Sequence, residues 1–201
     1  MNADSNRSRL VTRLAFLRRS GCVLGAAFSA ASLPTLAGQI VTQRFNLEEI
    51  KVAHLDRRRW KHLILHHSAT LTGNSAKFDR FHRERHHMEN GLAYHFVIGN
   101  GSDSGDGEIE IGPRWAKQLE GGHVSSRAFN ENSIGVCLVG NFEEQRPTPP
   151  QLTALIELLG CLKRDLVAGN CKLLLHREVN GERTLCPGRH FPAERIHRPL
   201  D

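Results

Sequence analysis

The sequence has few aromatic residues and no apolar stretch long enough to cross a membrane. Phe, Trp and Tyr make up 6% of the 201 residues, and Tyr94 is the only tyrosine. The longest apolar stretch, from Gly21 to Ala31, has roughly a dozen residues, whereas a spanning helix needs about 20. A transmembrane anchor is therefore not expected. Because 39% of the residues are hydrophobic and 24% are charged, the composition is that of a folded globular protein.

The sequence also lacks internal repeats, low-complexity tracts and paired Cys-x-x-Cys spacing. Without such cysteine pairs, a zinc-stabilised nucleic-acid binder is disfavoured. The charge distribution favours the same conclusion. The formal net charge is +6, but five arginines and one aspartate in residues 1–38 supply four of these charges, which leaves +2 for residues 39–201. Nucleic acid is therefore not expected as a partner, whereas an anionic cell wall is compatible with this charge.

Residues 1–38 have the pattern of a secretory signal peptide. Arginines come first, the apolar stretch follows, and Thr35-Leu36-Ala37 before Gly38 offers a cleavage site. This pattern predicts export to the periplasm or the extracellular space, with no stable membrane insertion after processing. The Arg18-Arg19 pair resembles part of a twin-arginine signal. The alternative is a basic tail or an uncleaved signal anchor.

The rest of the chain has a suitable length for one domain. Residues 39–59 form a polar lead-in, and residues 60–201 form the predicted domain. Short apolar runs predict strands, and 3.6-residue spacing of apolar residues predicts helices. The strands are expected over 62–66, 93–98, 108–111, 133–139 and 172–176, and the helices over 75–87, over 149–166 and after Pro192. This alternation favours a single α/β domain with a central mixed β-sheet flanked by α-helices.

Two local signals define where elements begin. Asp106-Gly107, directly before an alternating run, predicts a hairpin turn. Thr148 followed three residues later by Gln151 forms a capping box, and Pro149 suits the first position of a helix. The second long helix is therefore expected to begin at Pro149.

All 12 histidines follow residue 38, and two of them end apolar strands. His66 and His176 hold these positions, and Cys186 follows the second after a polar loop. Zinc binds imidazole nitrogen and thiolate sulfur, and a catalytic zinc site uses three protein ligands so that water can take the fourth position. The spacing alone leaves open that these are ordinary core or surface side chains.

Four sequence blocks occur in a distinctive order along the chain, namely His66–Thr70, Tyr94–Ile98, Asn132–Phe142 and Thr184–Gly188. Together they resemble the N-acetylmuramoyl-L-alanine amidase family, which includes phage amidase lysozymes and peptidoglycan recognition proteins. The resemblance covers about residues 60–196. Four blocks in register are far more specific than any single block.

The resemblance implies a role for particular residues. His66, His176 and Cys186 match the metal ligands of the family, and the expected metal is Zn²⁺. Tyr94 and Thr184 match its catalytic positions, where they are expected to stabilise the tetrahedral oxyanion. His123 and Asn132 are expected to bind substrate. The segment between His176 and Cys186 is longer here than in the phage proteins, which makes Thr184 the less certain match.

The function that the resemblance implies is hydrolysis of the amide between the lactyl group of N-acetylmuramic acid and L-alanine of the stem peptide. The expected partner is peptidoglycan or a muropeptide, and the expected oligomeric state is a monomer. One alternative is a non-catalytic peptidoglycan-binding or sensing module. Members that only bind peptidoglycan typically lack the cysteine, so Cys186 favours an enzyme. A cytoplasmic amidase that recycles muropeptides is the other alternative.

Other histidines and cysteines have simpler interpretations. His82 and His86 lie one helical turn apart, but a zincin helix needs glutamate directly after the first histidine, so a solvated helix face is expected. Cys161 and Cys171 either form a disulfide after export or remain buried thiols. Cys137 lies within an apolar strand and is expected in the core.

Overall fold

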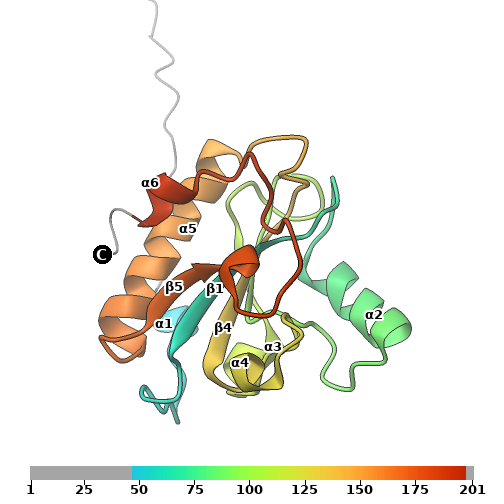
Figure 1. Ribbon diagram of the computed structural model, residues 1–201. Helices are drawn as coiled ribbons and strands as arrows, with labels where there is room; N and C mark the ends of the chain where they lie inside the picture. Colours follow the sequence, from blue (N-terminus) through green and yellow to red (C-terminus); the bar gives the residue numbers. More distant parts are fainter. Residues whose placement is uncertain (1–46, 198–201) are drawn as a thin grey trace, which may run out of the picture. The chain divides into compact units, whose positions relative to one another are not determined.

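The computed structural model describes residues 47–197, which form a five-stranded mixed sheet with helices around it (Figure 1). The predicted signal peptide lies outside the described residues. The strands are β1 (His62–His67), β2 (Phe96–Ile98), β3 (Ile109–Ile111), β4 (Ser133–Leu138) and β5 (Lys172–Leu175). The α-helices are α1 (Leu47–Ile50), α2 (Ser75–His86), α3 (Pro113–Ala116), α4 (Arg127–Asn132), α5 (Pro149–Cys161) and α6 (Ala193–His197). The predicted α/β class with a mixed central sheet is confirmed.

The strands lie in the order β3-β2-β4-β1-β5. β1 pairs in parallel with β4 and with β5, β2 pairs in parallel with β4, and only β3 runs antiparallel to its neighbour. The carboxyl ends of the four parallel strands therefore lie at one edge of the sheet. Side chains at the ends of β1 and β5 consequently lie near one another.

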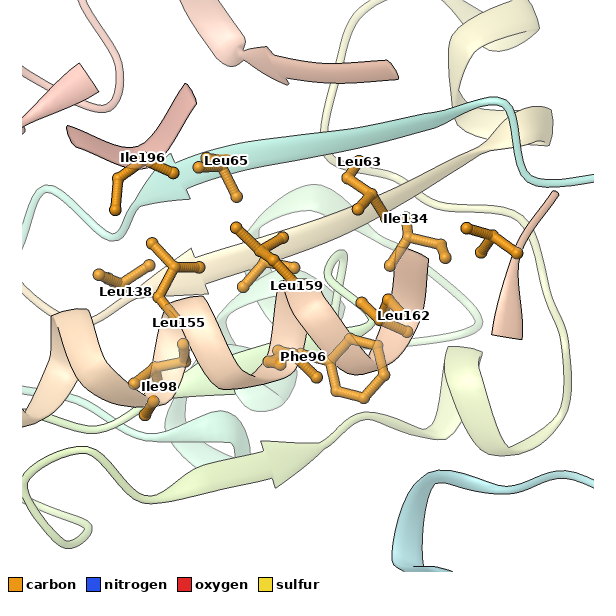
Figure 2. Packing of buried hydrophobic residues seen from close by; sticks show 14 of the residues in the cluster. Leu63, Leu65, Phe96, Ile98, Ile134, Leu138, Leu155, Leu159, Leu162 and Ile196 are labelled. Atoms are coloured by element: carbon orange, nitrogen blue, oxygen red, sulfur yellow. The ribbon is translucent and has the colours of Figure 1, made fainter. Parts of the chain in front are cut away.

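The larger core lies between one sheet face and α5 (Figure 2). Alternate residues of β1 and β4 point to this face, including Leu63, Leu65 and Ile134, and α5 contributes Leu155 and Leu159. All five side chains are fully buried. Burying a leucine or isoleucine contributes about 1.5–3 kcal/mol. This packing fixes the backbone of the strands that end at the candidate site.

Helix α5 begins where the capping box predicts. The Thr148 hydroxyl accepts a hydrogen bond from the Gln151 backbone N–H, and the Gln151 side chain accepts one from the Thr148 N–H. The helix continues after Cys161 as a π-helical turn, Leu162–Leu166. The predicted span to residue 166 is therefore helical throughout, although its last turn is wider than an α-helix. Within residues 47–197, no helix is long and apolar enough to span a membrane.

Ile50 of the lead-in, before the predicted domain start at residue 60, is buried in the main core, and its carbonyl accepts a hydrogen bond from the Trp115 indole. The predicted hairpin exists, since β2 and β3 pair antiparallel. Residues 99–108 connect the two strands, and within this loop Asp106-Gly107 forms the centre of the predicted turn, in which the Glu108 N–H donates to the Gly105 carbonyl at 3.0 Å.

The buried face of helix α2 contains His82, for which the sequence predicts a solvated face. Phe81 is 51% exposed, whereas His82 is only 9% exposed and its Nδ1 accepts a hydrogen bond from the Ala93 N–H at 3.2 Å. Burial lowers the pKa of His82 to about 4. The expectation of a solvated face at His82 was therefore wrong, because this imidazole satisfies a backbone donor of the segment that precedes β2.

His95 is a fully buried histidine with a structural role. Its Nδ1 accepts from the Gly135 N–H at 3.1 Å, its Nε2 lies 3.1 Å from the Leu119 carbonyl, and its ring meets Trp60 edge-on. These partners fix a neutral ring with its proton on Nε2. Burial lowers the pKa of His95 to about 3.

We predict that the metal-free protein loses stability as the pH falls from 7 to 5. The unfolded chain binds a proton at His95 below about pH 6.5, whereas the folded chain keeps this ring neutral down to its lowered pKa. Protonation therefore favours the unfolded state, by about 2 kcal/mol at pH 5 for this one histidine. Denaturant unfolding in the presence of chelator measures the effect.

His95→Asn supplies the control for this prediction. The variant is expected to be less stable at pH 7 but to lose less stability between pH 7 and pH 5 than the wild type. An equal loss in the two proteins would contradict the assignment to His95.

Candidate metal centre

Strand register brings the two strand-end histidines together. β1 and β5 run parallel with Leu65 opposite Leu175, so the next residues along the chain are His66 and His176. Alternation directs Leu65 and Leu175 into the main core, and the following residue of each strand points to the opposite face. The His66 and His176 ring centroids lie 4.5 Å apart.

Cys186 reaches the same place from the loop after β5. Its Sγ lies 3.8 Å from His66 Nδ1 and accepts a hydrogen bond from the His67 backbone N–H at 3.4 Å. His67 itself points away, and its Nδ1 accepts from the Phe142 N–H. Alternation along β1 therefore directs the two adjacent histidines to opposite faces of the sheet.

The three side chains form a group that could hold a metal ion. One donor atom each from His66, His176 and Cys186 lies within 4.8 Å of the other two, and no other such group occurs among residues 47–197. Tetrahedral zinc, with bonds of about 2.0–2.1 Å to nitrogen and 2.3 Å to sulfur, holds these atoms roughly 3.5 Å apart. The observed separation of 3.8 Å between Nδ1 and Sγ fits this requirement.

The electrostatics of the group also suit a cation. Burial lowers the pKa of His66 well below the usual histidine range, and burial likewise lowers the pKa of His176. Both rings are therefore neutral at pH 7 and have a lone pair to offer. Burial raises the pKa of the Cys186 thiol to about 12. A bound cation offsets that cost, because metal ligation requires the thiolate.

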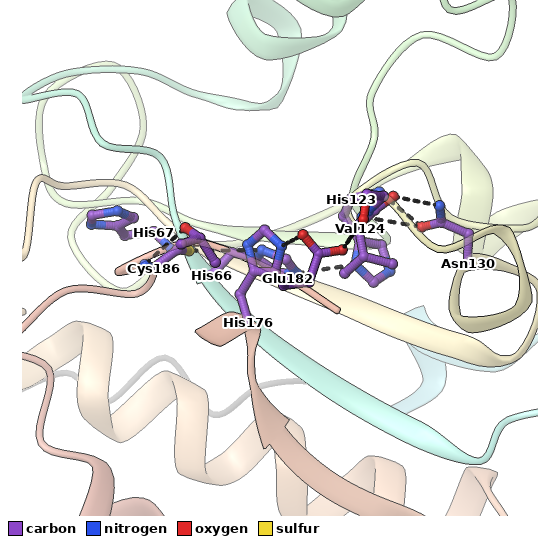
Figure 3. Close-up of polar contacts among 10 residues, drawn as sticks. His66, His67, His123, Val124, Asn130, His176, Glu182 and Cys186 are labelled. Atoms are coloured by element: carbon purple, nitrogen blue, oxygen red, sulfur yellow. Dashed lines mark hydrogen bonds and ion pairs between the residues drawn. The ribbon is translucent and has the colours of Figure 1, made fainter. Parts of the chain in front are cut away.

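The structure places His123 next to His66. It is 7% exposed, and its Nδ1 lies 3.0 Å from His66 Nε2 (Figure 3). The ring lies against the backbone of Gly121 and Gly135, where a methyl group on either residue would overlap it. His123 therefore contacts a candidate metal ligand, and its expected role in substrate binding stays a prediction.

Asn132 lies away from the candidate ligands. It precedes β4, at the amino end of the parallel strands, whereas His66 and His176 lie at the carboxyl ends. Its side chain contacts His62 Nδ1 at 3.1 Å and donates to the Ala128 carbonyl. Asn132 therefore joins α4 to the start of β1, and its expected role in substrate binding stays a prediction.

Glu182 is a site residue that sequence reasoning missed. Its carboxylate is only 10% exposed, and Oε2 lies 3.4 Å from His176 Nε2. Oε1 accepts hydrogen bonds from the N–H and hydroxyl of Ser125, both at 2.6 Å. Although burial alone would raise the pKa of Glu182, these donors and His176 lower it below the usual range. Its position in a polar loop gave no sequence signal.

Tyr94 lies against the candidate ligands. Its ring is partly buried, with its centroid 5.3 Å from that of His66 and 6.4 Å from that of His123. Burial, together with the nearby thiols of Cys137 and Cys186, raises the pKa of Tyr94. The hydroxyl is therefore protonated at neutral pH and can donate a hydrogen bond.

Thr184 and Glu178 each accept a hydrogen bond from a backbone N–H near the candidate ligands. Thr184 Oγ1 accepts from the Cys186 N–H at 3.1 Å, which leaves its own hydroxyl proton available to another acceptor. Glu178 Oε2 accepts from the Leu175 N–H at 2.8 Å and so orients the end of β5. Glu178 is therefore a structural residue of the strand end.

The other three cysteines within residues 47–197 are free thiols. Cys161 is partly exposed and Cys171 is buried, and neither forms a disulfide. Cys137 is fully buried, as its apolar strand predicts. It pairs with His66 in the register of β1 and β4, so its thiol lies beside the candidate metal centre.

Comparison with known proteins places this geometry in a family. The family model described as N-acetylmuramoyl-L-alanine amidase matches residues 56–189, which is more than half of the chain. The chain belongs to the N-acetylmuramoyl-L-alanine amidase family. Of the four sequence blocks in this family member, two supply His66 and Cys186 of the candidate metal centre, and a third supplies Tyr94 beside them.

Relatives of this amidase-family chain include both enzymes and recognition proteins. An endolysin of Klebsiella phage KP32 is 32% identical over 137 residues, which are 64% of this chain and 82% of the endolysin. The endolysin amidase LysCS from Clostridium intestinale has a TM-score of 0.60 and 31% identity, and the match covers 72% of this chain and 85% of that one. Peptidoglycan-recognition protein 2 of Holotrichia diomphalia is 30% identical over 128 residues, 59% of this chain and 63% of that protein's own length.

We predict that zinc stabilises the folded protein. At a free zinc concentration 100 times the dissociation constant, the expected gain is about 2.7 kcal/mol. Cys186→Ser is expected to lose most of this gain, because it removes one of the three donors. Denaturant unfolding with zinc and with chelator measures both values.

Cys171→Ser is the matched control, since Cys171 is also buried but precedes β5, at the end of the strand opposite the donor group. Its zinc-dependent gain should equal that of the wild type. If Cys186→Ser gains as much stability from zinc as the wild type does, Cys186 is not a ligand.

Proposed function

We propose that this protein is a zinc-dependent N-acetylmuramoyl-L-alanine amidase that releases the stem peptide from peptidoglycan or muropeptides. The observation that carries the proposal is the convergence of His66, His176 and Cys186, with the Tyr94 ring against them. Membership in the amidase family supports the reaction class. The donor set supports zinc, which prefers nitrogen and sulfur ligands in this combination.

Three protein donors support a catalytic site and not a structural one. Structural zinc sites use four protein ligands, whereas catalytic sites leave one position open. Among residues 47–197, the group contains two histidines and one cysteine, and Glu182 contacts His176 without belonging to it. A bound zinc ion would supply Lewis-acid polarisation of the scissile carbonyl and activation of water.

The chain's own residues supply hydrogen bonds for the reaction. The protonated Tyr94 hydroxyl would donate to the oxygen on which negative charge develops. The Thr184 hydroxyl, whose oxygen accepts from the Cys186 N–H, would supply a second donor. One well-placed donor of this kind lowers the barrier by about 3 kcal/mol. Tyr94 is also our candidate for proton transfer, aided by solvent.

Export is part of the same proposal. Peptidoglycan lies outside the cytoplasm, and residues 1–38 have the arginine-rich start and apolar stretch of a secretory signal. We therefore assign the site of action to the periplasm or the extracellular space. Detection of the mature chain outside the cytoplasm, with an N-terminus near Gly38, tests this assignment.

We predict that zinc-loaded protein releases free stem peptide from a defined muropeptide, as detected by mass spectrometry. Cys186→Ser should reduce release to the level without enzyme, because it removes a ligand. Cys171→Ser is the folded control and should retain the activity. Normal turnover by the Cys186→Ser protein would contradict the proposed site. Release of disaccharides would instead indicate glycosidase chemistry. Binding of the muropeptide without turnover by the wild type would favour the recognition-module alternative.

We predict that Tyr94→Phe lowers kcat by about 10²–10³-fold, because it removes a donor to the oxyanion. Its ring contacts with His66 and His82 are retained, so the zinc-dependent gain in stability should match that of the wild type. Steady-state kinetics on the same muropeptide measure the change. A normal kcat with intact zinc binding would exclude Tyr94 from the chemistry.

A further inference from the structure

One short segment, Gly121–Ser125, reaches both histidines of the metal centre. It lies between α3 and α4, and we call it the support segment. Asn130 of α4 anchors it: Asn130 Oδ1 accepts from the His123 N–H at 3.0 Å and the Val124 N–H at 3.2 Å, and Nδ2 donates to the Val124 carbonyl at 2.8 Å (Figure 3). The Gly121 N–H donates to the Asn130 carbonyl at 2.9 Å. The segment is thereby fixed to a helix outside the site.

The first arm of the segment ends on His66. Because His66 Nδ1 faces Cys186, the His66 ring carries its proton on Nε2, which then donates to His123 Nδ1 at 3.0 Å. His123 Nε2 in turn lies 3.4 Å from the Ser133 hydroxyl. Gly121 and Gly135 leave room for the His123 ring, because a methyl group on either residue would overlap it. This arrangement selects one tautomer and one ring orientation of His66.

The second arm ends on His176. Ser125 holds Glu182 Oε1 with two donors at 2.6 Å, and Glu182 Oε2 lies 3.4 Å from His176 Nε2. Apart from Glu182, the buried His176 Nε2 has no hydrogen-bonding partner within the described part of the chain. The carboxylate therefore attracts the proton of His176 to Nε2 and leaves Nδ1 free.

We propose that the support segment is a positioning element for the metal centre, in which His123 orients His66 and the Ser125–Glu182 pair orients His176. The proposal rests on the zinc site and the amidase function proposed above. Partners that accept the second N–H of a ligating histidine fix its tautomer and ring angle, and losing one typically weakens metal binding 10–100-fold. In this proposal His123 acts on the reaction through His66 and is a positioning residue.

The first experiment measures zinc affinity by competition with a chromophoric chelator. His123→Leu removes the acceptor for His66 and should weaken zinc binding by about 10–100-fold. His123→Asn places a carbonyl oxygen near the position of Nδ1 and should restore most of the affinity. The absorption spectrum of the Co²⁺-loaded proteins should change for the leucine variant and return towards the wild type for the asparagine variant.

Buried His95 supplies the matched control. Its ring centroid lies 6.0 Å from that of His123, but its hydrogen bonds go to Leu119 and Gly135 and not to the candidate ligands. His95→Leu should lower the stability of the metal-free protein while the zinc affinity of its folded fraction stays near the wild-type value. Equal loss of zinc affinity in the His95 and His123 variants would reduce the His123 effect to packing and overturn the proposal.

The second arm has its own pair of variants. Glu182→Gln removes the charge beside His176 and should weaken zinc binding by about tenfold or more. Glu131→Gln is the control, since the half-exposed Glu131 carboxylate pairs with Arg127 on α4. If the two arms hold separate ligands, the fold losses of His123→Leu and Glu182→Gln multiply in the double variant.

Asn130→Ala tests whether anchoring of the support segment matters, without a substitution in either arm. It should weaken zinc binding although Asn130 contacts neither His66 nor His176. Unchanged affinity in the His123, Glu182 and Asn130 variants, against a wild type that binds zinc and cleaves muropeptide, overturns the positioning role and leaves the proposed function intact. A wild type that binds no zinc instead removes the proposed function itself. If His123→Leu does not fold, the Glu182 and Asn130 variants decide.

Discussion

The candidate site depends on the parallel pairing of β1 with β4 and β5. That register places His66 beside the residue that follows β5, and it places Cys137 beside His66 on the same face. The register is held by the core on the other face, where leucines and isoleucines of the strands pack against α5. A shift of one residue in β1 would move His66 into that core and His67 into the site. The chemistry at the strand ends is therefore secured by apolar packing on the opposite side of the sheet.

Burial then gives the site its chemical character. Imidazoles that lose contact with water have lowered pKa values, so His66, His123 and His176 are neutral at pH 7 and act as lone-pair donors or hydrogen-bond partners. The same burial raises the pKa of the Cys186 thiol and the Tyr94 hydroxyl. Without a cation, this group of side chains contains no internal charge to offset the negative charge of a thiolate. A divalent ion resolves that imbalance, which is why the donor set and its environment both favour a metal.

Each histidine on this side of the sheet has a distinct partner. His82 and His95 satisfy backbone groups that precede or flank β2, whereas His123 contacts a candidate ligand. Only the three-dimensional arrangement distinguishes these roles, because the residues next to each histidine in the sequence do not indicate which group it contacts. The sequence likewise does not distinguish Glu178 from Glu182, which follow β5 and lie four residues apart. Glu182 contacts His176, whereas Glu178 accepts a hydrogen bond from the end of β5.

The sequence by itself determined the fold class, the capped start of α5, the strands that end in His66 and His176, and the family, because these follow from local periodicity, capping chemistry and ordered motifs. It did not indicate where residues with contacts to distant segments lie. Asn132 lies within a family block yet sits at the amino end of the sheet, His123 lies behind a ligand, and Ile50 enters the core from a segment without periodicity. The tertiary structure alone decided these placements, because strand direction and packing between distant segments determine which end of the sheet a residue occupies and what it contacts.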